Sequence, residues 1–579
     1  MRLGGEEVDK KEIGHLLDEI GLFLELKGEN PFKSKAYYNG ARTIEFLEED
    51  LAVLVQENRL AKLKGIGKTL ADNITELVLT GKLEYYEELK ASVPPGLLEM
   101  LRIPGLGPKK IKVIYEKLGI ATIGELEYAC QENRLIDLSG FGKKSQEKVL
   151  QGIEYLKRYQ GKFLFPVAWE EAVALGEQLS DHPQVSRWSV GGSLRRKKEI
   201  VKDIDLLVGT SDPLEVGAFL VSLPKVEKVI SQGDSKISLQ LDSGINVDVL
   251  LMEDNLFPYA LHHFTGSKEH NAAMRHRAKE KGIKINEYGL FKENKLLVCH
   301  NEKDFFQKLE LNFIPPELRE DLGEIQAAEK GNLPNLIEQK DLCGVFHVHT
   351  TYSDGIATLQ EIGDTARQMG LSYVGIADHS QSAVYAKGLK IGDIERQHEE
   401  IDFLNQRFTD FKFFKGVEAD ILADGNLDYP DEILARFDFV IASVHSRFNM
   451  SKKEMTERIQ KAMDNPYVTM LGHPTGRILL AREPYQVDME ALLQKALEKG
   501  IIMELNASPY RLDLDWINCK KAKSKGIKVS INPDAHKREH LQQIIYGVNI
   551  ARKGWLEAED VINTLSLQEI EKFLKKRYP

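Results

Sequence analysis

The sequence has few cysteines and no long apolar run. Only four of its 579 residues are cysteine (Cys130, Cys299, Cys343 and Cys519), and no Cys-x-x-Cys pair occurs. This pattern argues against a disulfide framework or a thiolate zinc site, and it fits a reducing compartment. No apolar run approaches the roughly 18 residues that a membrane-spanning helix needs, and the charged first twenty residues lack the apolar segment of a signal peptide. We therefore expect a cytoplasmic chain with no membrane partner.

A basic excess is also missing. The formal net charge is -11, which by itself argues weakly against a nucleic-acid partner. Net charge is an average, however, and a basic patch can lie on an acidic protein. Hydrophobic residues make up 42% and charged residues 29%, as in ordinary globular chains. The length allows three or four domains, and we expect a monomer.

Residues 1 to about 160 show apolar residues at helical spacing, interrupted by a short turn that occurs three times. Residues 63–68, 103–108 and 138–143 each read apolar-x-Gly-apolar-Gly and lead into a helix. Glycine lets a backbone approach a phosphate closely, and the start of a helix attracts anions. Ordinary helix–helix turns are the alternative, but the repetition favours contact with phosphates. The candidate contacts are Gly65, Gly67, Lys68, Gly105, Gly107, Gly140 and Gly142.

From about residue 160 to 315, strand-like runs replace the helices. Asp203 and Asp205 alternate with an isoleucine, so both carboxylates lie on one face of a strand. Asp248, in a second apolar run, can complete a set of three. Such oxygen ligands can hold two Mg²⁺ or Mn²⁺ ions, which activate a hydroxyl and stabilise a leaving pyrophosphate. An isolated Asp-x-Asp is often only a solvated pair, but the Gly-Gly-Ser-Leu-Arg-Arg turn at residues 191–196 can cradle a triphosphate.

These motifs resemble the family X DNA polymerases, the class that includes vertebrate polymerase beta. The turn and the three aspartates match the catalytic palm of that family, and residues 263–271 (His-Phe-Thr-Gly-Ser-Lys-Glu-His-Asn) resemble its Tyr-Phe-Thr-Gly-Ser element. The resemblance implies a template contact from Arg275. It implies nucleotide contacts from Gly192, Ser193, Arg196, His263, Phe264, Gly266, Ser267 and Asn271. For the three glycine turns, which resemble helix-hairpin-helix motifs, we also expect a bound monovalent cation.

Three positions depart from the family pattern. His263 replaces the usual tyrosine, which bears on sugar discrimination. Asn246 stands where the vertebrate relatives carry an arginine, which bears on rate. Asn73 occupies the place of the lysine that forms an imine with abasic sites in the family, and an amide cannot form that bond. We therefore expect no lyase activity of that type, although Lys33 or Lys35 can still bind a 5′-phosphate.

From residue 341 onward, seven apolar runs alternate with helix-like segments, which predicts a parallel barrel or sheet. Catalytic residues of such barrels lie at the carboxyl ends of the strands. Nine candidate metal ligands follow the runs: His347, His349, Asp354, His379, Glu418, His445, His473, Asp534 and His536. Imidazole and carboxylate groups suit Zn²⁺, Mn²⁺ or Fe²⁺. Nine ligands are too many for one ion, so we expect two or three ions bridged by Glu418, while Asp378 and Asp420 act behind the ligands or stay solvated.

This second cluster resembles the PHP (polymerase and histidinol phosphatase) family over residues 341–579. The two halves together resemble the bacterial and archaeal family X polymerases that carry a C-terminal PHP domain. That resemblance implies gap-filling synthesis in DNA repair on gapped or primed DNA with deoxynucleoside triphosphates. It also implies 3′→5′ exonuclease activity, with abasic-site endonuclease or 3′-phosphatase activity as further options. Two other readings stay open: a nucleotidyltransferase acting on RNA or small molecules beside a small-molecule phosphatase, and a catalytically silent DNA-binding scaffold.

The expected fold class is multidomain, mixing α+β and α/β parts. We expect an N-terminal helical DNA-binding domain (1–90), a fingers-like helical domain with two further turns (91–160), a nucleotidyltransferase palm (161–255), a thumb-like nucleotide-selection domain (256–315), a linker (316–340) and a distorted (β/α)7 PHP barrel (341–579).

Overall fold

The computed structural model describes residues 10–45, 47, 49, 51–63, 65–103, 105–157 and 161–575. Backbone contacts divide the chain into two units, Met1–Leu156 and Lys157–Pro579. Within the described ranges, no helix is long and apolar enough to cross a membrane.

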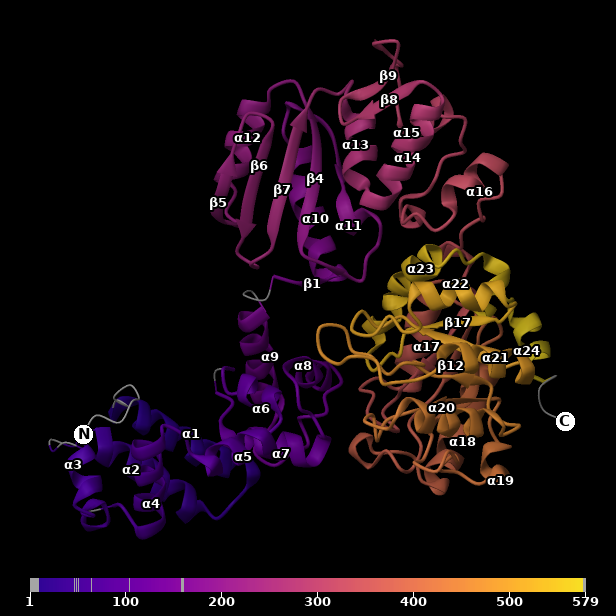
Figure 1. Cartoon of the computed structure of the whole chain (residues 1–579). Helices are drawn as coiled ribbons and strands as arrows, with labels where there is room; N and C mark the ends of the chain where they lie inside the picture. Colours follow the sequence, from indigo (N-terminus) through magenta and orange to yellow (C-terminus); the bar gives the residue numbers. More distant parts are fainter. Residues whose placement is uncertain are drawn as a thin grey trace. The chain divides into compact units, whose positions relative to one another are not determined.

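The first unit is helical throughout its described part (Figure 1). Its elements are α1 (Lys10–Lys27), α2 (Pro31–Glu45), α3 (Leu51–Gln56), η1 (Leu60–Lys62), α4 (Lys68–Thr80), α5 (Glu84–Ser92), α6 (Pro95–Met100), α7 (Pro108–Leu118), α8 (Ile123–Gln131) and α9 (Lys143–Lys157). Their apolar faces meet in one core, which includes Leu17, Ile74, Ile111 and Ile153. Burial of these helical stripes holds together helices that are mostly too short to be stable alone.

The three repeated turns of this unit share one backbone geometry. In each, the N–H of the residue between the two glycines donates to the carbonyl oxygen three residues earlier, at 2.9 to 3.1 Å. The first glycine has a positive φ in every copy: +95° at Gly65, +81° at Gly105 and +85° at Gly140. Side chains with a Cβ rarely adopt that conformation, so the repeated glycine is a backbone requirement. Each turn ends at the first residue of a helix, α4, α7 or α9.

The second unit begins with a mixed α/β region built on a five-stranded sheet of order β2-β4-β7-β6-β5. Its elements are β1 (Phe163–Leu164), α10 (Phe165–Ser180), β2 (Val185–Val190), α11 (Gly192–Arg195), β3 (Ile200–Val201), β4 (Asp203–Thr210), α12 (Pro213–Ser222), β5 (Val226–Gln232), β6 (Lys236–Leu241) and β7 (Asn246–Met252). Strands β4 and β7 run parallel and lie at the centre of the sheet. Their inward residues are apolar, which fixes the register that sets the polar residues of the other face side by side.

A smaller helical region with a three-stranded sheet follows. It contains α13 (Phe257–Thr265), α14 (Lys268–Glu280), β8 (Ile283–Asn286), β9 (Gly289–Lys292), β10 (Lys295–Leu296) and α15 (Glu302–Lys308). The segment 316–340, for which the sequence suggested a linker, carries η2 (Pro316–Leu318), α16 (Glu324–Lys330) and the start of η3 (Gln339–Asp341). Its few apolar residues, among them Leu318 and Ile325, pack into the core of this region around Phe305 and Phe306. The segment therefore extends the thumb-like region.

The C-terminal region is a barrel of seven parallel strands in sequence order, with helices on its outside (Figure 1). The strands are β11 (Gly344–Val348), β12 (Tyr373–Ile376), β13 (Lys412–Asp420), β14 (Phe439–Ser443), β15 (Met470–Leu471), β16 (Ile502–Asn506) and β17 (Val529–Asn532). The helices are α17 (Leu359–Gln368), η4 (Val384–Ala386), α18 (Ile391–Arg407), α19 (Asp431–Leu434), α20 (Lys452–Met463), α21 (Met489–Lys499), α22 (Trp516–Ser524), η5 (Arg538–Gln543), α23 (Ile544–Lys553), η6 (Ala558–Asp560), η7 (Ile562–Thr564) and α24 (Leu567–Lys575). The expected seven-stranded barrel is confirmed.

The barrel closes at the rim formed by the carboxyl ends of its strands. The N–H of His349 donates to the carbonyl oxygen of Ala535 at 2.9 Å, and the N–H of Ala535 donates to the carbonyl oxygen of His347 at 3.3 Å. These bonds join the residues after the last strand, β17, to the first strand, β11. Candidate ligands from the two ends of the domain are thereby fixed beside each other.

Candidate active sites

The first candidate site lies on the two central strands of the palm sheet. Asp205 on β4 pairs directly with Asp248 on β7, and Asp203 pairs with Asn246 in the same register. Residues two apart on a strand point to the same face, so all four side chains lie on one side of the sheet. The structure thus brings the three predicted carboxylates together.

The surroundings of Asp205 disfavour its charged form. Burial, and then the negative charges of Asp203 and Asp248, raise the pKa of Asp205 to about 6. Ser238 donates a 2.6 Å hydrogen bond to Asp248, and the Lys236 ammonium lies 2.7 Å from its other oxygen. The remaining crowding of negative charge is the environment that a divalent cation would relieve, so the donor set fits hard metal ions.

The glycine turn before α11 touches the same carboxylates. Gly192 has a φ of +56°, and a Cβ built on it would lie 1.9 Å from Oδ2 of Asp205. The N–H of Gly191 donates to the carbonyl oxygen of Asp205 at 2.7 Å. The turn, with Ser193 at its third position, is therefore packed directly against β4, and a side chain at position 192 would displace the Asp205 carboxylate.

Arg196 follows the turn and reaches the His-Phe-Thr-Gly-Ser element. Its guanidinium donates to the carbonyl oxygen of Thr265 at 2.5 Å and forms an ion pair with Glu320 at 3.1 Å. Arg195 bonds to the hydroxyl of Thr265 at 2.6 Å and pairs with the buried Glu302 at 2.5 Å.

Glu302 is shared between two arginines. It also pairs with the wholly buried Arg319 at 2.6 Å. Burial alone would raise the pKa of Glu302, but Arg319 and Arg195 outweigh it and lower that pKa to about 2. An ionised, buried carboxylate therefore holds the helix α11, through Arg195, to the thumb-like region.

The His-Phe-Thr-Gly-Ser element covers the end of α13 and the turn that leads into α14. Asn271 donates to the carbonyl oxygen of His263 at 2.7 Å, while its own amide oxygen is buried and has no hydrogen-bond partner. His263 and Phe264 have ring centroids 5.1 Å apart, and burial lowers the pKa of His263. Gly266 and Ser267 connect α13 to α14, with Ser267 capping α14. Asn271 therefore keeps one acceptor that no described residue satisfies.

The predicted DNA contacts lie at the surface. Gly65, Gly67, Lys68, Gly105, Gly107 and Gly140 are exposed, Gly142 is half-buried, and Arg275 is exposed on α14. These placements leave the helix starts of the first two turns open to a phosphate backbone, whereas the N–H of Gly142 in the third turn donates to the hydroxyl of Ser145 at 2.8 Å. Lys64 and Pro104, inside two of the turns, lie outside the described residues.

The position expected for an imine-forming lysine holds a bonded amide. Asn73 donates to the hydroxyl of Tyr37 at 2.8 Å. Lys33 lies over the ring of Tyr85, 5.6 Å from its centroid, and its contact with the Tyr85 hydroxyl raises the pKa of Lys33. A raised pKa keeps the amine protonated, which opposes nucleophilic attack.

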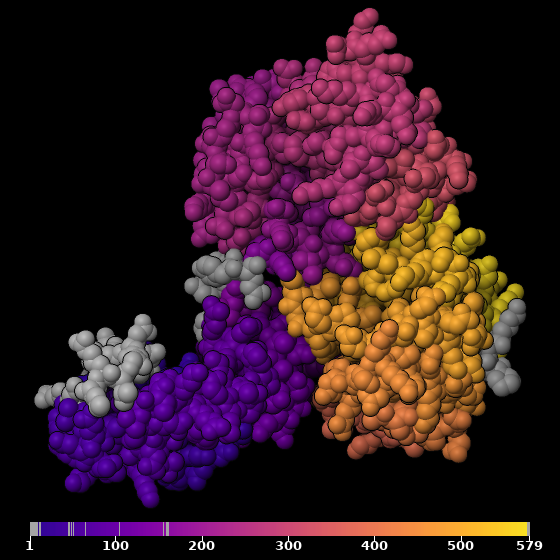
Figure 2. Space-filling model, in the orientation of Figure 1, coloured from indigo at the N-terminus to yellow at the C-terminus, as the bar shows by residue number. Residues whose placement is uncertain are grey.

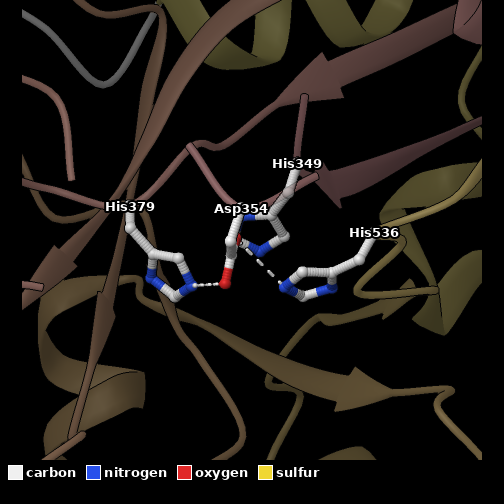
Figure 3. Close-up of side chains that lie close together, drawn as sticks. All are labelled: His349, Asp354, His379 and His536. Carbon is white, nitrogen blue, oxygen red and sulfur yellow. Dashed lines mark ion pairs between the residues drawn. The ribbon is translucent and has the colours of Figure 1, made fainter. Parts of the chain in front are cut away.

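The second candidate site is a cage at the rim of the barrel. All nine predicted ligands meet there, in three overlapping groups whose ligand atoms lie within 4.8 Å of one another: His349, Asp354, His379 and His536; His347, His349 and Asp534; and His379, Glu418 and His445. His473 completes the set, with its Nε2 2.9 Å from Oε1 of Glu418. Figure 3 shows three of the histidines gathered around Asp354.

Glu418 lies at the centre of this cage. Its two oxygens lie within 3.8 Å of imidazole nitrogens of five histidines, namely His347, His349, His379, His445 and His473. This arrangement suits the bridging role expected of Glu418.

Several imidazole nitrogens in the cage are buried without a hydrogen-bond partner. They include Nε2 of His347, Nε2 of His349 and Nε2 of His379. Buried polar atoms are normally paired, so a group of orphaned nitrogens facing carboxylates fits metal ligands. Three ligands also have left-handed backbones, with φ of +59° at His347, +25° at His473 and +50° at Asp534. Such strained conformations gather at functional sites.

Comparison with known proteins matches both halves of this architecture. Residues 8–83 match a helix-hairpin-helix domain, 97–154 a SAM-like helix-hairpin-helix tandem, 260–320 the DNA polymerase beta thumb and 346–508 the PHP domain. The DNA polymerase/3'-5' exonuclease PolX of Bacillus subtilis (strain 168) is 40% identical over 571 residues, covering 98% of this chain and 99% of that protein. The chain belongs to the family X DNA polymerases that carry a PHP domain. The expected family is thereby confirmed.

The PHP half of this family X polymerase has relatives of its own. A probable phosphatase of Thermoanaerobacter sp. (strain X514) is 30% identical over 243 residues, covering 40% of this chain and 94% of that protein. A probable phosphatase of Caldanaerobacter subterraneus subsp. tengcongensis is 29% identical over 248 residues, covering 40% of this chain and 90% of that protein.

Two carboxylates behind the PHP cage orient its histidines. Glu504 on β16 lies 2.6 Å from Nδ1 of His347 and accepts from the N–H of His473 at 2.6 Å. Asp420 lies 2.5 Å from Nδ1 of His445. A carboxylate on the far nitrogen fixes the ring and leaves its other nitrogen for a metal. Sequence reasoning missed Glu504, although a charge inside the apolar run Ile-Ile-Met-Glu-Leu-Asn was a usable signal.

Asp378 has a structural role beside the same cage. It is fully buried and accepts bonds from the N–H and hydroxyl of Thr350, from Ser353 and from Gln397. These bonds fix the loop that follows His349. Asp378 therefore supports the ligands from behind.

Proposed function

We propose that this family X polymerase extends DNA at the Asp203–Asp205–Asp248 site and shortens 3′ ends at the PHP cage. The chain is a DNA polymerase and a 3′→5′ exonuclease acting on DNA with deoxynucleoside triphosphates, as the full-length match to the Bacillus subtilis enzyme indicates. The observation that supports the division of labour is the presence of two separate ligand sets, one of three carboxylates and one rich in histidine.

Each residue set suits one half of the reaction. The three aspartates would hold two Mg²⁺ or Mn²⁺ ions, and the PHP cage two or three ions of Mn²⁺, Zn²⁺ or Fe²⁺. When bound, such ions supply the positive charge that stabilises a phosphoryl transition state and makes a hydroxyl or water a better nucleophile. Arg196 would bind the triphosphate, and Asn271 would offer its amide oxygen to the base. The exposed glycine turns would hold the DNA backbone, together with a monovalent cation.

The biological task that fits these parts is filling short gaps during DNA repair. The glycine turns of the first unit bind backbone without reading sequence, which suits gaps of any sequence. An enzyme acting on RNA or small molecules would not need three such turns. A silent scaffold would not need the complete carboxylate and imidazole sets.

The test uses end-labelled gapped DNA with Mn²⁺, with and without nucleotides. Asp205→Ala should abolish strand growth and leave shortening intact, because the PHP cage does not involve Asp205. His347→Ala should abolish shortening and leave growth intact. His300→Ala, an exposed histidine outside both sites, is the matched control. Chelation should remove both activities.

The proposal fails if His347→Ala removes growth but spares shortening. A parallel reaction with single-stranded RNA tests the alternative substrate, and the gap-filling assignment is wrong if RNA is extended as fast as gapped DNA.

A second activity of the PHP cage follows from its phosphatase relatives. Proteins named probable phosphatases match this region over most of their own length. We propose that the cage also removes a 3′-phosphate and so prepares a blocked end for extension. A primer ending in 3′-phosphate should be extended by the wild type but not by His347→Ala. Equal extension by the variant would exclude this activity.

A further inference from the structure

One loop connects the two parts of the polymerase site. Residues 197–202 join Arg196, the candidate triphosphate cation, to Asp203, the first carboxylate of β4. A shift of this short loop would move either or both of these groups. What holds the loop therefore bears on nucleotide binding and on the position of the carboxylate.

The PHP domain contributes a buried lysine to this loop. Lys553, at the end of α23, has a completely buried side chain. Its ammonium donates to the carbonyl oxygen of Arg196 at 3.1 Å and to that of Glu317 at 3.3 Å, and it pairs with Glu320 at 2.6 Å. Burial lowers the pKa of Lys553 to about 8, against the opposing charge of Glu320. Burying an ammonium is costly unless acceptors surround it, and here the acceptors come from the polymerase side.

A second PHP cation reaches the middle of the loop. Arg477, in the segment after β15, pairs with Glu199 at 2.5 Å. The same guanidinium donates to the carbonyl oxygens of Arg511 and Leu512, within the PHP domain. Both side chains of the pair are largely buried, with exposed fractions of 12% and 17%. Arg477 is thus anchored in one domain and binds the other.

Glu320 links these contacts to nucleotide binding. It pairs with Arg196, with Lys198 and with Lys553. Lys198 and Lys553 also lie over the ring of Trp516, at 5.0 and 4.8 Å from its centroid. Figure 2 shows the yellow surface of the C-terminal segment meeting the rose surface of the thumb-like region without a gap. Without Lys553, Glu320 would be balanced by fewer cations and would hold Arg196 more tightly.

We propose that Lys553 and Arg477 are positioning residues for nucleotidyl transfer, through which the PHP domain holds the loop between Arg196 and Asp203. This inference rests on the proposed roles of Arg196 and Asp203. In it, the nuclease domain serves the polymerase reaction as part of the scaffold of the site. The two cations act at different points, so their removal has different kinetic consequences.

The experiment measures single-nucleotide insertion on gapped DNA by the full chain. Lys553→Met should raise the KM for the nucleotide about tenfold with a smaller change in kcat, because Arg196 is held by Glu320. Glu199→Gln, which removes the palm partner of Arg477, should lower kcat about tenfold with little change in KM, because Asp203 is displaced. A purely structural defect would lower the amount of active enzyme and would not separate the two constants.

Two control variants test whether the loss of any PHP cation would have the same effect. Lys495→Met and Arg436→Met remove PHP cations that pair with Asp464 and Glu395 and make no contact with the palm. Both should behave as wild type. Hydrolysis of bis(p-nitrophenyl) phosphate with Mn²⁺ reports on the PHP cage, and it should change less than twofold in Lys553→Met and Glu199→Gln. Retained hydrolysis shows that these variants are folded.

A double-mutant cycle keeps the proposal testable if one variant folds poorly. Adding Glu199→Gln to Arg477→Gln should cost no further kcat/KM, since the contact between these two residues is already broken by Arg477→Gln. The inference is overturned if Lys553→Met and Glu199→Gln insert nucleotides with wild-type constants while Asp205→Ala is inactive. If Asp205→Ala were active, the proposed function itself would be wrong, which is a separate outcome.

Discussion

Gly192 offers the sharpest test of the polymerase site. In Gly192→Ala, the new Cβ would lie 1.9 Å from Oδ2 of Asp205, whereas an ordinary contact begins near 3.4 Å. The carboxylate or the turn must therefore retreat by about 1.5 Å. A displacement of about 1 Å at a reacting centre can cost on the order of 100-fold in rate. The left-handed backbone adds a stability cost of about 1–2 kcal/mol for any residue with a Cβ.

The stability cost and the displacement can be measured separately. Gly282→Ala is the matched control, because Gly282 has a similar φ of +69° and no atom within 4 Å of its Cβ position. Single-turnover insertion on gapped DNA should fall about 100-fold or more in Gly192→Ala and stay near wild type in Gly282→Ala. Both variants should keep their 3′→5′ shortening. Near wild-type insertion by Gly192→Ala would refute the contact between this turn and the carboxylate.

Three further predictions concern single residues. Glu504→Gln should weaken Mn²⁺ binding to the PHP cage about 10- to 100-fold, measured by metal titration of shortening activity, because it loosens His347. Glu302→Gln should lower the free energy of unfolding at pH 7 by about 3 kcal/mol, since Arg319 loses a buried partner. The pKa of Glu302 is depressed, so the carboxylate stabilises the fold fully above about pH 4.5, and this stabilisation is lost as the pH falls towards 2. In urea unfolding, the free energies of unfolding of the wild type and Glu302→Gln should therefore converge as the pH falls below about 4.5. Borohydride should trap no adduct between the wild type and DNA with a 5′-deoxyribose phosphate, because Lys33 stays protonated; a trapped adduct would contradict this assignment.

The PHP ligands could be predicted from the sequence because the same pattern, a histidine or carboxylate after an apolar strand, recurs along the barrel. Each histidine or carboxylate follows an apolar run, and the ends of parallel strands meet at one rim. The palm aspartates could be predicted for a similar reason, since Asp203 and Asp205 alternate along a strand. Asp248 could be proposed as the third carboxylate from its place in a second apolar run, but its direct pairing with Asp205 could not be predicted, because strand pairing is non-local.

Other features could not be predicted from the sequence, for physical reasons. Strand β5 is an exposed edge strand, so it lacks the buried apolar alternation that marks a strand. The segment 316–340 looked like a linker because it is polar, yet several of its charged residues are themselves buried. Arg319 and Glu324 are both fully buried and paired, and hydrophobicity cannot reveal such burial. The contact between Lys553 and Glu320 joins residues more than 200 positions apart, with no local signal.

The contacts of Lys553 also imply an effect in the opposite direction. If these contacts bias the loop that carries Arg196, then nucleotide binding to Arg196 must bias the contacts by the same free energy. A triphosphate competes with Glu320 for Arg196 and leaves that carboxylate more fully to Lys553. Hydrogen exchange should therefore slow at residues 197–202 and at the end of α23 when a deoxynucleoside triphosphate and Mg²⁺ are added. Lys553→Met should lose this protection at α23, whereas Lys495→Met should keep it. Unchanged exchange at α23 in the wild type would show that nucleotide binding at Arg196 and the contacts of Lys553 are not energetically coupled.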